Sequence, residues 1–94
     1  MQQQDTTTAH TIALEAISYI FSEGYLRDRF FALTGLSPEG MRASLEDPHF
    51  LSSTLGFLID HEPDLLAFAA FIEKKPESIV IAWRTLGGGQ GQEW

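Results

Sequence analysis

Residues 31–43 have the sequence FALTGLSPEGMRA, and this stretch joins two helical patterns through one sharp corner. The apolar pattern of residues 25–34 stops at Gly35, the residue type that favours the left-handed conformation after a helix. Ser37 and Pro38 then begin a second helix, because serine caps a helix N-terminus and proline suits the first helical position. The stretch therefore predicts two short helices joined by a tight corner.

A similar pattern returns later in the chain. Residues 9–45 align without a gap on residues 47–83, with many apolar residues falling on apolar residues. Two amphipathic patterns can overlap in this way by chance, but the pair Pro38-Glu39 also falls on Pro76-Glu77. A repeat changes how the whole fold is interpreted. It predicts two tandem three-helix units related by a pseudo-two-fold axis.

The apolar spacing predicts an all-α fold of six short helices in a single small domain. The expected helices span about residues 9–22, 25–34, a short stretch from residue 38, 48–60, 63–73 and a last stretch from residue 76 to residue 87. Residues 79–81 are β-branched, but a lone strand would have no partner. Gly56 weakens the fourth helix by about 1 kcal/mol relative to alanine, which predicts close approach of another helix.

The two ends of the chain differ in composition from the middle. Residues 1–8 are polar and residues 87–94 are rich in glycine, so both are expected to be disordered around a domain at residues 9–86. The longest apolar run, residues 65–72, is far shorter than the ~20 residues of a membrane span. With no cysteine and no secretory signal, the sequence predicts a cytoplasmic protein that does not bind membranes.

The charge argues against nucleic-acid binding. Thirteen acidic and six basic residues give a net charge of −7, whereas affinity for phosphates comes mainly from basic side chains. The corner at residues 31–43 resembles a helix-turn-helix, and a nucleic-acid-associated regulator that uses it is the alternative function. That alternative requires Arg27, Arg29 and Arg42 to form one positive face. The sequence predicts no nucleic-acid partner.

No motif in the sequence indicates catalysis. Residues 60–64 contain three carboxylates and a histidine, but they are consecutive at a predicted turn and lack a metal-binding loop pattern. The three histidines are dispersed, and Ser52 and Ser53 lie within a helix without a nucleophile motif. We expect a non-catalytic protein with no metal and no cofactor.

A few aromatic residues lie away from the predicted core positions. Helix 25–34 is expected to bury Leu26, Phe30 and Leu33, which leaves Phe31 on the opposite side. Tyr19 and Phe57, equivalent in the two repeats, lie at the edges of their apolar faces. Exposed aromatic residues often dominate binding energy. Tyr19, Phe31 and Phe57 are therefore the candidate partner-binding residues, and at least one is expected to be exposed or covered by another subunit.

Several stretches of the sequence resemble a family of small bacterial proteins catalogued as a domain of unknown function, number 3572. The matching stretches are residues 12–17, residues 31–42, Asp47-Pro48, Phe50-Leu51, residues 55 and 57–59, and residues 65–69, so the resemblance covers about residues 12–86. The chain departs from the family pattern at Gly56, where many members carry aspartate. No activity is assigned to the family, so the resemblance implies no catalytic residue. The predicted function is a protein-interaction or regulatory module whose partner is an unknown protein or a second copy.

Overall fold

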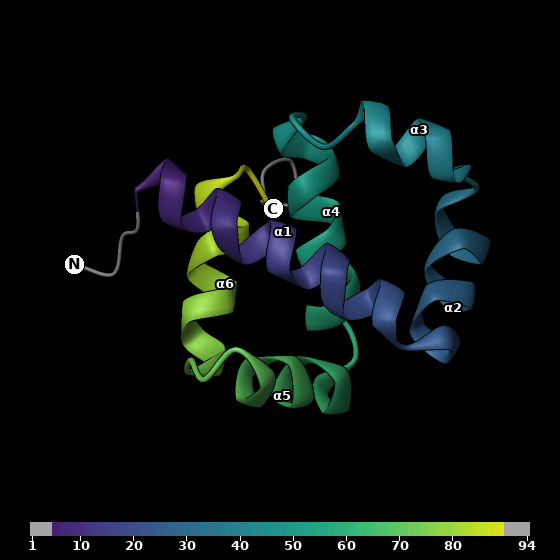
Figure 1. Ribbon diagram of the computed structural model, residues 1–94. Coiled ribbons are helices and arrows are strands. Elements are labelled where there is room, and N and C mark those ends of the chain that lie inside the picture. Colours follow the sequence, from purple (N-terminus) through teal and green to yellow (C-terminus); the bar gives the residue numbers. More distant parts are fainter. Residues whose placement is uncertain (1–4, 90–94) are drawn as a thin grey trace.

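The computed structural model of the chain describes residues 5–89, which form six α-helices and contain no strand (Figure 1). The helices are α1 (Thr6–Ser22), α2 (Gly24–Thr34), α3 (Pro38–Ala43), α4 (Pro48–Ile59), α5 (Glu62–Phe71) and α6 (Pro76–Thr85). The predicted all-α class is confirmed, and the β-branched residues 79–81 lie in α6. None of the described helices is long and apolar enough to cross a membrane.

Helix α1 is the centre of the fold. It packs against α2, α4 and α6, while α4 also packs against α5 and α6 (Figure 1). The buried face of α1 is formed by residues at helical spacing: Ala9, Ile12, Ala13, Ala16, Ile17 and Ile20. Burial of each large apolar side chain contributes about 1.5–3 kcal/mol to folding. The core therefore lies mainly where α1, α4 and α6 meet.

The predicted corners are formed by the predicted residues. Gly35 has a φ of 71° and closes α2 in the left-handed conformation. The Ser37 hydroxyl accepts a hydrogen bond from the backbone N–H of Gly40 at 3.0 Å, and the Asp47 carboxylate accepts one from that of His49 at 3.0 Å. These bonds satisfy N–H groups that have no partner within a helix. Residues 31–43 therefore form a structural corner between α2 and α3.

Both predicted domain boundaries need correction. Helix α1 begins at Thr6 because the Asp5 carboxylate caps it, accepting a 2.7 Å hydrogen bond from the backbone N–H of Thr8. This bond also lowers the pKa of the Asp5 carboxyl. The disorder predicted for residues 1–8 is therefore wrong from Asp5 onward. For residues 1–4 and 90–94 the prediction lies outside the described residues.

At the other end, the first glycines of the tail form a helix cap. The backbone N–H of Gly88 donates to the Trp83 carbonyl at 2.7 Å, and that of Gly87 donates to the Arg84 carbonyl at 3.0 Å. Gly87 has a φ of 104°, as this type of cap requires. Residues 87–89 consequently belong to the folded domain, and Gly88 and Gly89 lie against the Trp83 indole.

The close approach predicted at Gly56 is confirmed. A Cβ atom placed on Gly56 would lie 3.2 Å from Trp83 Nε1, so the indole of α6 lies directly on the α4 backbone. This contact is part of the packing between α4 and α6. The close contact with Trp83 explains why a glycine stands at position 56, although glycine weakens a helix.

The two predicted three-helix units, residues 9–45 and 47–83, resemble each other in part. Helix α1 packs on α2 as α4 packs on α5, but α3 and α6 differ. Helix α6 has ten residues and buries Ile79 and Ala82, whereas α3 has six residues and buries none. The pseudo-two-fold relation stays a prediction, and it does not extend to the packing of the third helices.

Helix α5 ends in a strained cap, which makes a stability prediction possible. Glu73 has a φ of 58°, while its N–H donates to the Ala70 carbonyl at 3.2 Å and that of Lys74 donates to the Ala69 carbonyl at 2.9 Å. Glycine adopts this conformation without the steric cost that other residues have. We expect Glu73→Gly to raise the free energy of unfolding by about 0.5–1 kcal/mol, measured by urea denaturation. Glu73→Ala removes the same charge and should give no gain; an equal gain in both variants would assign the effect to charge.

Candidate functional site

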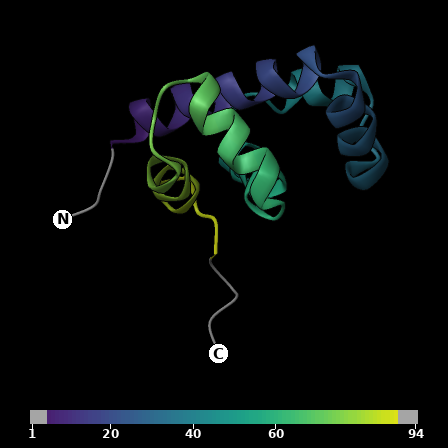
Figure 2. The same cartoon turned by 90° about the horizontal axis from the view of Figure 1, so that it is seen from below.

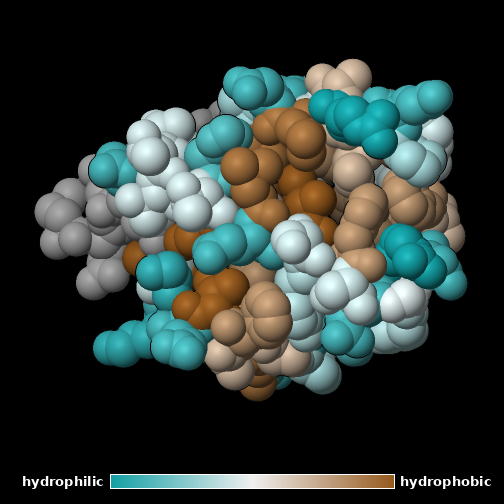
Figure 3. All heavy atoms as spheres, in the orientation of Figure 1, coloured by the Kyte–Doolittle hydropathy of each residue, from teal (hydrophilic) through white to brown (hydrophobic). Residues whose placement is uncertain are grey.

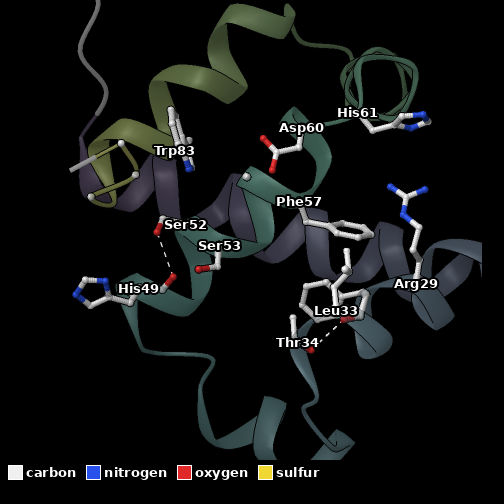
Figure 4. Close-up of a pocket in the computed structure, with 15 residues that line it drawn as sticks. Arg29, Leu33, Thr34, His49, Ser52, Ser53, Phe57, Asp60, His61 and Trp83 are labelled. Carbon is white, nitrogen blue, oxygen red and sulfur yellow. Dashed lines mark hydrogen bonds between the residues drawn. The ribbon is translucent and has the colours of Figure 1, made fainter. Parts of the chain in front are cut away.

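A groove of about 750 Å³ lies along the outer side of α4. Figure 2 shows α2 and the short yellow segment directly after α6, residues 86–89, both extending away from α1. Residues of both segments line the groove. Its walls are the C-terminal half of α2 on one side and Trp83 with residues 87–89 on the other (Figure 4). The α4 residues that line it are His49, Ser52, Ser53, Gly56 and Phe57, and Asp60, the residue that caps the end of α4, lines it as well. These lie on the side of α4 opposite most of its core residues.

Leu33 is the most exposed large apolar side chain of the described residues. It was expected to be buried with Leu26 and Phe30, and this prediction is wrong because its side chain is 70% exposed. Leu33 lines the groove, so no helix covers it. The wall formed by α2 therefore presents a large apolar side chain to the open groove.

One end of the groove is closed by a charged network between α2 and α5. The Arg29 guanidinium donates to Asp64 Oδ2 at 2.9 Å, and His61 Nδ1 lies 2.8 Å from the same oxygen. Asp64 is buried, and Arg29 also hydrogen-bonds the Tyr25 hydroxyl. A buried carboxylate requires such partners, since an unpaired charge is costly to bury. The network fixes the position of α2 relative to α5.

Arg29 also contacts the aromatic floor of the groove. Its guanidinium carbon lies 4.8 Å from the centre of the Phe57 ring and 5.2 Å from that of Tyr25. Both distances fall in the range of cation–π contacts. One face of the Phe57 ring is thus occupied by a cation that the protein itself supplies.

Asp60 is in a different situation from Asp64, although both belong to the acidic stretch 60–64. Its side chain is exposed and points into the groove between Phe57 and Trp83 (Figure 4). Within residues 5–89, no hydrogen bond or ion pair is formed by this carboxylate. The fold therefore divides the acidic stretch between an internal ion pair and a free charge in the groove. No sequence pattern distinguished these two aspartates.

Two of the three hydroxyl groups that line the groove, those of Ser52 and Thr34, are used within their own helices. The Ser52 hydroxyl donates to the His49 carbonyl at 3.1 Å, and that of Thr34 donates to the Phe30 carbonyl at 2.9 Å. The imidazole of His61 is held by Asp64. What the groove offers to a ligand is therefore aromatic surface, the exposed Leu33, the Asp60 carboxylate, the Ser53 hydroxyl and the His49 imidazole.

The structure does not bring the three candidate partner-binding residues together. Phe57 lines the groove, with its ring centre 5.3 Å from that of Phe30. Phe31 packs on Phe21 at 5.4 Å, away from the groove lining. All three candidates, Tyr19 included, are half-buried and pack against the core, so the expected exposed member is not found. Their role in partner binding stays a prediction.

Tyr19 lies on an aromatic contact between α1 and α5. Its ring centre is 5.4 Å from that of Phe68 and 5.1 Å from that of Phe71. Burial raises the pKa of the Tyr19 phenol, and the nearby carboxylates of Glu23 and Asp64 raise it further. The phenol is accordingly neutral at physiological pH, and the ring serves as packing between the two helices.

Sequence reasoning placed the exposed apolar surface on the wrong residues. Among residues 5–89, the large apolar side chains that are exposed are Leu14, Tyr25, Leu33, Leu66 and Phe71. Figure 3 shows that hydrophobic side chains on the face carrying α1 form separate patches, with hydrophilic atoms between them. Of the five residues, Leu33 alone lines the groove.

Comparison with known proteins gives one result. The profile of a protein family described as protein of unknown function (DUF3572) matches residues 6–89. No curated protein and no solved structure matches the chain. The match begins at the first residue of α1 and ends at the glycine cap after α6, so it covers all six helices and every wall of the groove. The chain therefore belongs to the DUF3572 family of proteins of unknown function.

Proposed function

We propose that the protein is a small non-catalytic interaction module that binds a protein partner in the groove along α4. The observation that carries this proposal is Leu33, which is 70% exposed and faces a groove of about 750 Å³. Exposed large apolar side chains beside a concave, partly aromatic surface are typical of sites that bind another molecule. A partner that covers Leu33 removes that apolar surface from water.

The shape of the groove also supports the proposal. The Arg29–Asp64 ion pair holds the α2 wall, and the glycine cap holds Gly88 and Gly89 against Trp83 on the other wall. A site that is held in its binding shape loses less conformational entropy when a partner binds. The groove is thus a preformed surface rather than one assembled by its ligand.

The nucleic-acid alternative gains no support from the arginines. The Arg29 guanidinium forms an ion pair with Asp64 of α5, and Arg27 Nε lies 3.6 Å from Asp28 Oδ1. Two of the three guanidinium groups that this function requires already face carboxylates. A second copy of the chain is also a weaker candidate than a different protein, because each copy carries a charge of −7.

The proposal is tested by comparing two leucine variants. Leu33→Asp places a charge in the groove, whereas Leu66→Asp makes the same change at a 47% exposed position on α5 outside it. Protein captured from native cells by the tagged wild type should fall at least about tenfold with Leu33→Asp, as expected for a binding hot spot, and remain with Leu66→Asp. Both variants should keep the wild-type thermal midpoint, because both leucines are exposed.

Quantitative mass spectrometry of the captured proteins gives the measurement. A partner that is retained by Leu33→Asp, or lost equally with both variants, contradicts binding in the groove.

A further inference from the structure

The groove has a charge preference as well as an apolar contact. Its lining contains one arginine, Arg29, whose charge is balanced by Asp64, and one aspartate, Asp60, which has no counterion among residues 5–89. The chain as a whole carries a charge of −7. The uncompensated charge of the lining is therefore negative, and the surrounding protein reinforces it.

The surroundings of Asp60 suit a cation in particular. Its carboxylate lies between Phe57 and Trp83, whose rings form the floor and one wall of the groove (Figure 4). Aromatic faces attract ammonium and guanidinium groups, and tryptophan attracts them most strongly. The Arg29 guanidinium already lies over Phe57, 4.8 Å from its centre, and Gly88 and Gly89 lie on the Trp83 indole. The unpaired Asp60 carboxylate is therefore the main attraction for a lysine or arginine, and the ring edges beside it supply apolar contact for the alkyl part of that side chain.

The cation site and the apolar site belong to one groove. Leu33 lies on the α2 wall, while Trp83 lies on the opposite wall and Asp60 on the α4 floor (Figure 4). A ligand that fills the groove must therefore present an apolar side chain to Leu33 and a positive charge to Asp60. An amphipathic segment with basic and apolar residues on adjoining faces meets both requirements.

We propose that the occupant of the groove is a basic amphipathic segment of a partner protein, with a lysine or arginine placed on Asp60 between Phe57 and Trp83. This inference rests on the proposed function, since it names the chemistry of the partner that the groove binds. A basic partner would also give a role to the unpaired Asp60 carboxylate and to the net charge of −7.

Two synthetic peptides serve as probes. Both have about 18 residues with leucine at helical spacing; the remaining positions are lysine in one peptide and glutamate in the other. Binding is followed by calorimetry and by the fluorescence of Trp83 in a Trp94→Phe background. We expect the lysine peptide to bind at least about tenfold more tightly than the glutamate peptide.

Two variants separate the groove carboxylate from net charge. Asp60→Asn should weaken binding of the lysine peptide about five- to tenfold. Glu46→Gln removes the same charge at an exposed position outside the groove, and should change binding by less than about twofold. Equal weakening by both variants would show attraction by net charge alone and overturn the inference.

The other outcomes separate this inference from the proposed function. If the glutamate peptide binds as tightly as the lysine peptide and Leu33→Asp abolishes both interactions, the groove binds partners without a preference for basic segments. The inference is then overturned while the proposed function stands. If neither peptide binds the wild type, the inference is also overturned, and the capture experiment with Leu33→Asp decides the proposed function independently.

Discussion

Phe30→Ala is expected to lower the free energy of unfolding by about 3–5 kcal/mol. The Phe30 side chain is 1% exposed, and its ring centre lies 5.3 Å from that of Phe57 and 6.1 Å from that of Phe50. These contacts join α2 to α4, and α2 buries one other residue, Leu26. Alanine leaves a cavity that the short helix cannot close. A loss of this size is a large part of the roughly 5–15 kcal/mol that stabilises a typical domain.

Urea denaturation followed by circular dichroism measures this loss. Phe71→Ala is the matched control, because that phenylalanine is 64% exposed and should cost less than about 1 kcal/mol. Hydrogen exchange should also accelerate in α2 more than in α6, since Phe30 holds α2 in place. A loss below about 1 kcal/mol for Phe30→Ala would mean that α2 does not depend on this contact.

Gly88→Ala is expected to lower the free energy of unfolding by about 1–3 kcal/mol, the usual effect of overpacking. A Cβ atom on Gly88 would lie 2.2 Å from Trp83 Nε1 and 2.4 Å from Trp83 Cδ1, so the indole ring must move. The ring is also confined by Gly56 on α4. The substitution therefore displaces Trp83 or breaks the hydrogen bond between the Gly88 N–H and the Trp83 carbonyl.

Thermal or urea denaturation gives the stability change, and Trp83 emission in a Trp94→Phe background reports the movement of the indole toward water. Gly24→Ala provides the control, because a Cβ atom at this first residue of α2 meets its nearest atom at an ordinary 3.5 Å. It should leave stability unchanged or slightly raised. Unchanged stability and emission in Gly88→Ala would contradict the placement of Gly88 and Gly89 on the indole.

The sequence predicted the helices better than it predicted the surface. Caps and corners depend on a few neighbouring residues, so Gly35, Ser37 and Asp47 could be identified from local chemistry alone. The helical spacing of Leu26, Phe30 and Leu33 also gave the correct direction for two of these side chains. This spacing could not show that Leu33 faces the open groove and not another helix.

The candidate site was predicted only through Phe57. The exposure of Leu33 and the different roles of Asp60 and Asp64 depend on which helices meet, and the sequence contains no local signal for this. The glycines at 87–89 were interpreted as a flexible tail from composition. Their role follows from the position of Trp83, which depends on the packing of α6 against α4.

Residues 37–46, which include helix α3, form a weakly packed segment, here called the seam, between the two halves of the chain. It buries no residue fully, and Met41 and Leu45 are only half-buried against the core that α1, α4 and α6 share, so we expect residues 37–46 to open locally at a lower free energy than those helices. Proteases act on segments that open in this way. A chain cut at the seam would still be held together, because α1 on one fragment packs against α4 and α6 on the other. The fold therefore consists of two segments, one with α1 and α2 and one with α4 to α6, that are held together mainly by helix packing. The α3 segment that links them contributes little to their association.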